Sequence, residues 1–137
     1  MANSSDAITP LVGRFLVSVM FLVSGFFKVV GYSQMVGFAA AKGLPLASLS
    51  IACAAALELL GGLAILTGFH TRIAAWLLLL YLIPTTLLFH NFWAMQGMEQ
   101  QDNMIHFLKN LAIMGGLLIL AAYGAGAYSV DARANKT

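Results

Sequence analysis

The chain has 137 residues, of which 61% are hydrophobic and only 9% are charged, and its formal net charge is +2. Soluble domains are about 45–50% apolar and about 25% charged, so this composition predicts an integral membrane protein. Several of the few basic residues lie within apolar stretches, which leaves no basic surface for nucleic acid. Cys53 is the single cysteine, which excludes an intramolecular disulfide and a cysteine-rich metal site, and we expect it to be a small buried residue.

Four apolar segments dominate the chain, near residues 8–30, 45–67, 73–90 and 104–123. A bilayer core of about 30 Å needs about 20 helical residues, so each segment can form one transmembrane helix. Short connections favour antiparallel neighbours, and an even number of spans places both chain ends on one side. The predicted fold is an all-α membrane protein, a four-transmembrane-helix antiparallel bundle, and we expect residues 1–137 to form a single domain.

The first span places its polar and small residues on one face. These residues recur at alternating spacings of four and three, namely Arg14, Ser18, Phe21, Gly25 and Lys28. Such spacings repeat on one side of an α-helix, so this face is predicted to point into the bundle. The segment that follows, residues 31–44, is too short and apolar for a linker between domains, and it could lie in the membrane interface as a short helix.

The second span carries a carboxylate within a stripe of small residues. The stripe comprises Ala54, Ala55, Glu58, Gly61, Gly62 and Ile65. Small residues allow two helices to approach closely, so Glu58 is predicted to lie mid-membrane at a tight helix contact. A pair with Lys28 or Lys109 is plausible, and Glu58 is a candidate catalytic residue because charges inside a membrane are costly. The alternative is a purely structural ion pair, or a protonated carboxyl group hydrogen-bonded across helices.

His90 ends the third span, and His106, Lys109 and Asn110 lie at the start of the fourth. Together with Lys28, the residues His90, Lys109 and Asn110 could line one pocket at the outer side. Histidine ordinarily titrates near neutral pH, so His90 could pass protons, while Lys109 and Asn110 offer donors to a carbonyl or an anion. Alternatively, the lysines snorkel to the interface and His90 is a surface residue. Two histidines without supporting cysteines or carboxylates do not predict a metal site.

Aromatic residues and the distribution of charged residues indicate how the bundle is oriented in the membrane. We interpret as interfacial anchors the aromatic residues Trp76, Tyr81, Phe92, Trp93, Tyr123 and Tyr128. The side of the chain ends carries Arg14, Arg72, Arg133 and Lys136, and the opposite side carries Lys28, Lys42, Lys109, Glu99 and Asp102. This bias favours a multi-pass protein with both termini in the cytoplasm.

Five segments resemble a known family in their order and spacing. They are GRFLVSVMFLVSGFFKVVGY at 13–32, ALELLGGLAILTGFHTR at 56–72, LLFHNFW at 87–93, NMIHFLKNLAIMGGLLIL at 103–120 and AYSVDA at 127–132. In this combination the chain resembles the DoxX family of small four-helix membrane proteins. The resemblance implies a bacterial inner-membrane bundle. It also implies a structural ion pair that closes the bundle, between an arginine at the start of the first helix and an aspartate after the fourth, here Arg14 and Asp131.

The resemblance also links some relatives to membrane oxidoreductase systems, including a thiosulfate:quinone oxidoreductase. The leading hypothesis is therefore a membrane subunit of a quinone-linked oxidoreductase system, with the quinone or another small ligand held among Lys28, Glu58, His90, Lys109 and Asn110. Electrons would come from a soluble or membrane redox partner, because the chain encodes no bound redox group. The alternatives are a small-solute carrier or ligand-binding protein, for which alternating access calls for a homo-oligomer, and a non-catalytic anchor or assembly factor in the lipid bilayer.

Overall fold

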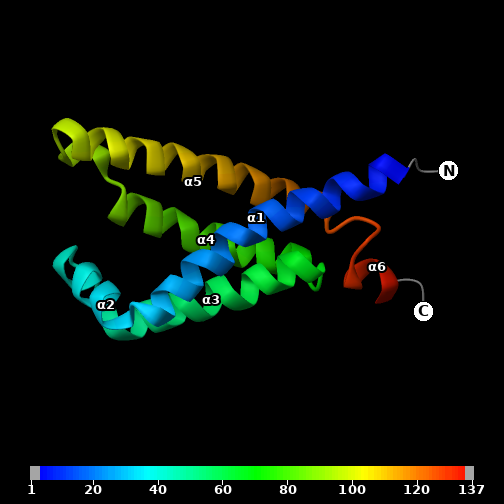
Figure 1. The fold of residues 1–137 in the computed structure, drawn as a ribbon, viewed down its shortest axis with the longest axis horizontal. Helices are drawn as coiled ribbons and strands as arrows, with labels where there is room; N and C mark the ends of the chain where they lie inside the picture. Colours follow the sequence, from blue (N-terminus) through cyan, green and yellow to red (C-terminus); the bar gives the residue numbers. More distant parts are fainter. Residues whose placement is uncertain (1–3, 135–137) are drawn as a thin grey trace.

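A computed structural model describes residues 4–134 of the chain, which form helices joined by short connections (Figure 1). Lys136, which contributed to the predicted orientation, lies outside the described residues. In chain order the helices are α1 (Ser4–Val30), α2 (Tyr32–Ala41), α3 (Ala47–Thr67), α4 (Thr71–Phe89), the short 3₁₀ helix η1 (Phe92–Ala94), α5 (Gly97–Tyr123) and α6 (Val130–Ala134).

Helices α1, α3, α4 and α5 are long and apolar enough to cross a membrane, which confirms the predicted all-α bundle of four transmembrane helices. The fourth span differs most from its predicted limits, because α5 begins at Gly97 whereas the sequence predicted a start at residue 104. The segment before Met104 is polar, so the hydropathy of the sequence does not assign it to the span. It is nevertheless rich in good helix formers such as Glu99 and Gln100, which extend the helix beyond the apolar part.

The four long helices are arranged as two pairs. Helix α1 packs mainly against α3, and α5 packs against α4, while the pairs meet through α3 and α4. Figure 1 shows both chain ends at one end of the bundle, hereafter the termini end, and α2 and η1 at the other, hereafter the α2 end. Neighbours in the chain run antiparallel, as the short connections predicted.

The predicted inward faces of the first two spans are confirmed. In α1 the residues Arg14, Ser18 and Phe21 are buried, and the whole predicted stripe of α3 is buried as well. The approach of the two helices is close at Gly25, where an added Cβ would lie 2.8 Å from Leu59 Cγ. Glycine therefore brings α1 and α3 near enough for a short polar contact in the membrane interior.

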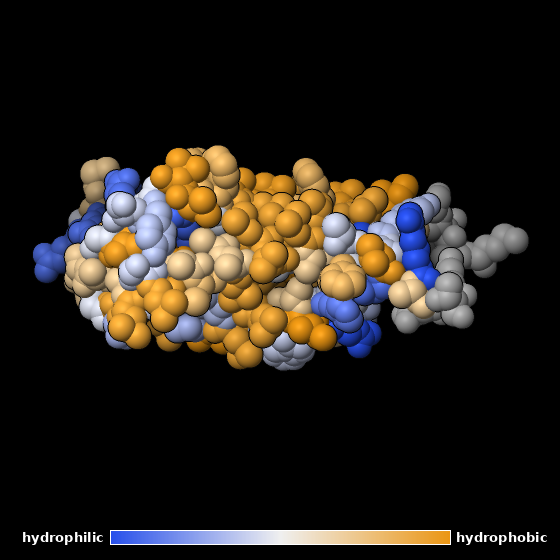
Figure 2. Space-filling model, turned by 90° about the horizontal axis from the view of Figure 1, so that it is seen from below, coloured by the Kyte–Doolittle hydropathy of each residue, from blue (hydrophilic) through white to orange (hydrophobic). Residues whose placement is uncertain are grey.

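The surface around the middle of the bundle is apolar, and Figure 2 shows this band flanked by hydrophilic residues toward both ends. Large apolar side chains of the spans, such as Leu60 and Phe27, are more than half exposed, at 68% and 61%. The prediction that Cys53 is buried is wrong, because its side chain is exposed. In a membrane protein apolar residues face lipid as well as the core, so apolar character alone does not indicate burial.

Residues 31–44 contain α2, which confirms a short helix after the first span. Ala39 is fully buried, and the ring of Phe38 stacks on that of Phe89 with a centroid distance of 5.7 Å. Tyr32 donates a hydrogen bond of 2.7 Å to the carbonyl of Ser48. Helix α2 is thus held at one side by α3 and reaches across to the last turn of α4. Its position in a membrane interface remains a prediction.

The termini end is closed by contacts of Arg14 and Asp131 with the turn between α3 and α4. Arg14 is buried, donates a hydrogen bond to the Tyr128 carbonyl and packs against Gly68. Asp131 accepts hydrogen bonds from the backbone N–H groups of His70 at 2.7 Å and Thr71 at 3.0 Å. These amides begin α4 and have no partner within the helix, and a carboxylate also favours the positive end of the helix dipole.

Among the residues described, Arg14 and Asp131 form no direct salt bridge. The two residues therefore close this end of the bundle through different contacts: Arg14 binds the segment after α5 and packs on Gly68, and Asp131 binds the first amides of α4. Burial raises the pKa of Asp131, but the hydrogen bonds donated by Thr71 and His70 outweigh this effect and hold the pKa below its usual value.

Candidate functional site

A cavity of about 530 Å³ lies between the two helix pairs toward the α2 end. Residues from α1 to α5 line it, and most of its wall is apolar, including Phe21, Leu57 and Ile113. All five predicted ligand-binding residues line this cavity, namely Lys28, Glu58, His90, Lys109 and Asn110. Arg14 and Asp131 are not among its lining residues and lie toward the termini end.

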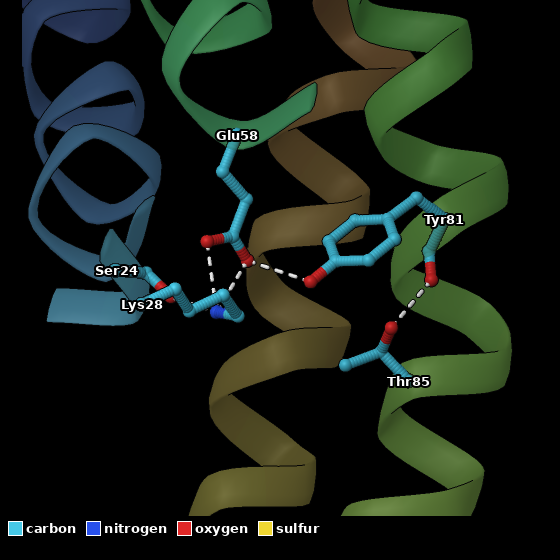
Figure 3. Close-up of polar contacts among 5 residues, drawn as sticks. All are labelled: Ser24, Lys28, Glu58, Tyr81 and Thr85. Carbon is cyan, nitrogen blue, oxygen red and sulfur yellow. Dashed lines mark hydrogen bonds and ion pairs between the residues drawn. The ribbon is translucent and has the colours of Figure 1, made fainter. Parts of the chain in front are cut away.

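The deep part of the cavity holds an ion pair between α1 and α3. The Lys28 ammonium group donates hydrogen bonds to both carboxylate oxygens of Glu58, at 2.9 Å and 2.8 Å (Figure 3). It donates a third bond of 2.7 Å to Ser24 Oγ, one helical turn earlier. Lys28, and not Lys109, is therefore the partner of Glu58, because α1 packs directly on α3 at Gly25.

A third helix contributes to the same cluster. Tyr81 of α4 donates a hydrogen bond of 2.7 Å to Glu58 Oε1, and Figure 3 shows its ring pointing from α4 toward the carboxylate. Thr85, one turn later, donates to the carbonyl of Tyr81 at 2.8 Å. We define the ionic cluster as Lys28, Glu58 and Tyr81. It joins α1, α3 and α4 in the membrane interior, where each unsatisfied polar group is costly.

Sequence reasoning missed Tyr81, which it interpreted as an interfacial anchor. Its hydroxyl group instead binds Glu58 in the interior. The available signal was position, because Tyr81 is at the middle of the span predicted over residues 73–90, whereas anchoring aromatics gather at span ends. A buried tyrosine hydroxyl generally has a hydrogen-bond partner, and Glu58 is the acidic residue at a comparable depth.

At the mouth of the cavity the lining residue His90 stacks on His106, which lies outside the lining. The rings of His90 and His106 are nearly parallel with a centroid distance of 5.1 Å. Asn103 donates from Nδ2 to the carbonyl of Glu99 at 3.0 Å, which turns its Oδ1 toward His90 Nδ1 at 3.1 Å. Since that oxygen can only accept, His90 carries a proton on Nδ1, and its Nε2 remains to exchange a proton with a ligand.

Lys109 extends along α5 to the other histidine. Its ammonium group lies 3.0 Å from His106 Nδ1, and since an ammonium group has no acceptor, the histidine nitrogen accepts this bond. Lys109 itself is exposed, in contrast to the almost fully buried Glu58. Lys109 thus places a positive charge at the mouth of the cavity, and its hydrogen-bond partner His106 does not neutralise that charge.

Asn110 is buried beside the mouth and ties α5 to α4. It donates from Nδ2 to Thr86 Oγ1 at 3.0 Å, and Thr86 in turn donates to the carbonyl of Leu82 at 2.6 Å. One N–H group of Asn110 is therefore used between helices, which gives it a positioning role. Over the described part of the chain no group of three or more histidine, cysteine, aspartate or glutamate side chains could hold a metal ion.

Comparison with known proteins identifies the family. A model of the family described as DoxX matches residues 9–91, which include the whole of α3 and α4 and all but the start of α1. The chain belongs to the DoxX family. This match covers Lys28, Glu58 and Tyr81 and ends just after His90, so α5 with Lys109 and Asn110 lies outside it.

Two relatives in Escherichia coli strain K12 extend this result. The chain is 38% identical to inner membrane protein YphA over 91 residues, which cover 66% of this chain and 65% of that protein. It is 48% identical to inner membrane protein YqjF over 80 residues, which cover 58% of each. The chain thus matches less than two thirds of the length of either relative. With its four apolar helices, this DoxX protein is an integral inner-membrane protein.

A eukaryotic protein also shares part of the sequence. The ER-derived vesicles protein ERV29 of Saccharomyces cerevisiae is 32% identical over 75 residues, which cover 55% of this chain and 24% of that protein. No solved structure matches the chain.

Proposed function

We propose that this DoxX protein is a ligand-binding membrane subunit of a quinone-linked oxidoreductase system, and that its cavity holds a quinone ring. The observation that carries the proposal is the cavity of about 530 Å³ with apolar walls and a few convergent polar groups. Small-molecule sites typically enclose about 300–1,000 Å³ and combine these two kinds of lining. The donors of Lys109 fit a carbonyl oxygen of a quinone, and the unprotonated Nε2 of His90 fits a hydroxyl group of the reduced quinol.

Each polar residue has a distinct part in this proposal. Lys109 donates to a ring oxygen at the mouth, and His90 passes a proton between that oxygen and water through Nε2. Asn110 positions α5 against α4. Glu58, held by Lys28 and Tyr81, keeps the inner end of the cavity polar and ordered. A bound quinone would supply two-electron chemistry, and the electrons would come from a redox partner because the chain encodes no bound redox group.

The proposal treats residues 1–137 as one membrane domain, because helices α1 to α5 all line the same cavity. It places both termini in the cytoplasm and the α2 end at the outer side, which is the orientation that the basic residues favour. In that orientation His90 exchanges protons with the outer aqueous phase. A soluble or membrane redox partner would bind the subunit in the membrane.

A second candidate is a small-solute carrier, and the division of the bundle into two helix pairs favours it. The pairs meet through α3 and α4 while the cavity lies between them, so rocking at that contact would expose the cavity to one side or the other. Uptake of a solute into proteoliposomes that contain only this protein would support the carrier. A protein that binds quinone without uptake would support the redox subunit.

The proposed site can be tested with a photoactivatable azidoquinone. Purified protein in lipid nanodiscs is irradiated with the probe, and the labelled peptides are mapped by mass spectrometry. We expect labels on the cavity-lining parts of α3, α4 and α5, and we expect decylubiquinone to compete with labelling. Glu58→Gln and Lys109→Ala in folded protein should weaken competition. Labelling confined to lipid-facing residues such as Leu60, or no competition, would overturn the proposal.

A further inference from the structure

The charges in the cavity do not cancel. Two lysines and one glutamate line it, and Lys28 and Glu58 neutralise each other through two hydrogen bonds of 2.9 Å and 2.8 Å. Glu58 also accepts a bond from Tyr81, so its carboxylate is already engaged by two partners. The charge of Lys109 at the mouth is therefore left without a counterion from the lining.

The surroundings of Lys109 add no negative charge. Its ammonium group contacts His106 Nδ1, a neutral acceptor at 3.0 Å. Over residues 7–134 the Lys28–Glu58 pair is the one salt bridge, so neither Glu99 nor Asp102 on the same helix neutralises Lys109. Lys42 of the α2 end contributes a further positive charge, because its ammonium group lies 5.8 Å from the ring centroid of Phe38, which lines the cavity.

An unpaired lysine beside an apolar cavity favours an anion. Although Lys109 is exposed, its charge attracts an oppositely charged group at short distance, and the apolar wall beside it reduces the screening of that attraction by water. A neutral quinone carbonyl can also accept a hydrogen bond from the Lys109 ammonium group, but it carries no full negative charge and gains less Coulomb attraction to the lysine. The mouth of the cavity thus discriminates between a neutral and an anionic ring.

We infer that the cavity selects an acidic hydroxyquinone, bound as its anion with the charged oxygen at Lys109 and an alkyl chain along the apolar wall. This inference rests on the proposed function, since it names the class of quinone for the same site. Lys109 is then the specificity-determining residue, and His90 Nε2 lies at the same mouth to exchange protons with the ring oxygens. The cluster of Lys28, Glu58 and Tyr81 is internally neutral and does not contribute to the preference.

A matched pair of probes tests this inference. The first is a 2-hydroxy-3-alkyl-1,4-naphthoquinone, which is anionic at neutral pH, and the second is its neutral 2-methoxy ether with the same alkyl chain. Both compete with azidoquinone labelling in phosphatidylcholine nanodiscs, and the concentrations are corrected for partition into empty nanodiscs. We expect the hydroxy compound to bind about tenfold more tightly, which corresponds to about 1.4 kcal/mol of additional Coulomb attraction between its anion and Lys109.

Two variants assign the preference to Lys109. Lys109→Gln removes the charge and keeps donors, and we expect it to bind both compounds about equally. Arg72→Gln is the matched control, because it removes one positive charge at the exposed surface of the termini end. It should retain the preference. Decanoate tests whether a ring is required, and competition as strong as that of the hydroxyquinone would overturn the assignment to a ring anion.

The possible failures are distinct. If both naphthoquinones compete equally in the wild-type protein, the inference is wrong while the quinone site stands. If neither competes and azidoquinone labels no cavity residue, the proposed function itself fails. The wild-type comparison does not depend on any variant, so loss of folded Lys109→Gln protein would leave the main test in place.

Discussion

Tyr81 donates a hydrogen bond of 2.7 Å to the same Glu58 oxygen that accepts one of the two bonds from Lys28. The carboxylate of Glu58 in α3 thereby joins α1 and α4, which lie on either side of this carboxylate in Figure 3. The two helix pairs of the bundle meet through α3 and α4, so the Tyr81 bond crosses the contact on which the whole cavity depends. This bond is the first that mutation should test.

Tyr81→Phe should destabilise the protein by about 1.5–3 kcal/mol, the usual contribution of a hydrogen bond to a charged group. The ring still fills its place between α3 and α4, so packing is retained. Thermal unfolding in mild detergent measures the effect. Tyr123→Phe is the control. The side chain of Tyr123 is 82% exposed at the end of α5, so this substitution should leave the stability unchanged. Equal stability of the two variants would contradict the role given to Tyr81.

The Lys28–Glu58 pair predicts strong coupling in a double-mutant cycle. Lys28→Met or Glu58→Gln alone leaves a charge without its partner in the membrane interior, and each should cost about 3–5 kcal/mol. The double variant leaves no net charge there and should cost clearly less than the sum of the single variants. Unfolding in detergent by heat or denaturant gives the difference in stability between the wild type and each of the three variants. Simple additivity would show that the two side chains do not interact.

Much of this cluster could be predicted from the sequence, and the reason is periodicity. The spacing of Arg14, Ser18 and Lys28 placed the inward face of α1 correctly, since helical geometry alone decides which residues share a face. The small residues around Glu58 predicted the close helix contact for the same reason. The choice between Lys28 and Lys109 as its partner could not be made, because it depends on which helices are neighbours.

Other features depend on tertiary structure and were beyond the sequence. Tyr81 was assigned to the interface because aromatic residues are common there, and only the packing of α4 on α3 shows its hydroxyl group at Glu58. Cys53 was expected to be buried, but helix α3 turns it away from the packed core. Arg14 and Asp131 were expected to form an ion pair, whereas Arg14 donates to the Tyr128 carbonyl between α5 and α6, and Asp131 accepts from the amides at the start of α4.

Asp131 predicts a pH dependence at the termini end. Its pKa is lower in the folded protein than in the unfolded chain, because the amides of Thr71 and His70 bind its ionised form. Its stabilising contribution is therefore fully present above the unfolded pKa of about 3.9 and is lost as pH falls through the lower folded pKa. Asp131→Ala should cost about 0.5–2 kcal/mol at neutral pH, as the loss of a helix cap does.

The measurement for Asp131 is thermal unfolding of both proteins from pH 7 to pH 3. The difference in stability between wild type and Asp131→Ala should be constant near neutral pH and shrink below about pH 4. A difference that grows on acidification would contradict the assignment of the lowered pKa to these amide bonds.

Two glycines of α1 should respond in opposite ways to the same substitution. A Cβ at Gly25 would lie 2.8 Å from Leu59 Cγ and 3.2 Å from Glu58 Cβ, whereas a Cβ at Gly13 would meet nothing within 4 Å. Gly25→Ala should therefore separate α1 from α3 and destabilise the protein by about 1–3 kcal/mol. Gly13→Ala should be neutral or stabilise the protein by up to about 1 kcal/mol, because alanine favours the helix. Melting curves of the two variants make the comparison directly.

Cys53 offers a test of both the cavity and the orientation. It is exposed, lines the cavity and lies in the half of α3 nearer the α2 end. A cavity that admits water at the α2 end should let a membrane-impermeant maleimide reach this thiol. With both termini in the cytoplasm, intact spheroplasts should therefore be labelled, and inverted membrane vesicles should not. Labelling of the vesicles alone would reverse the predicted orientation.

The control for this labelling is a cysteine that faces lipid on the same helix. Leu60→Cys in a Cys53→Ser background fits this purpose, because Leu60 is 68% exposed and does not line the cavity. Both thiols are exposed, yet only Cys53 borders a space with polar groups that can hold water, so we expect the lipid-facing cysteine to be unreactive from either side. Equal labelling of the two positions would mean that the maleimide reaches α3 through the bilayer and not through the cavity.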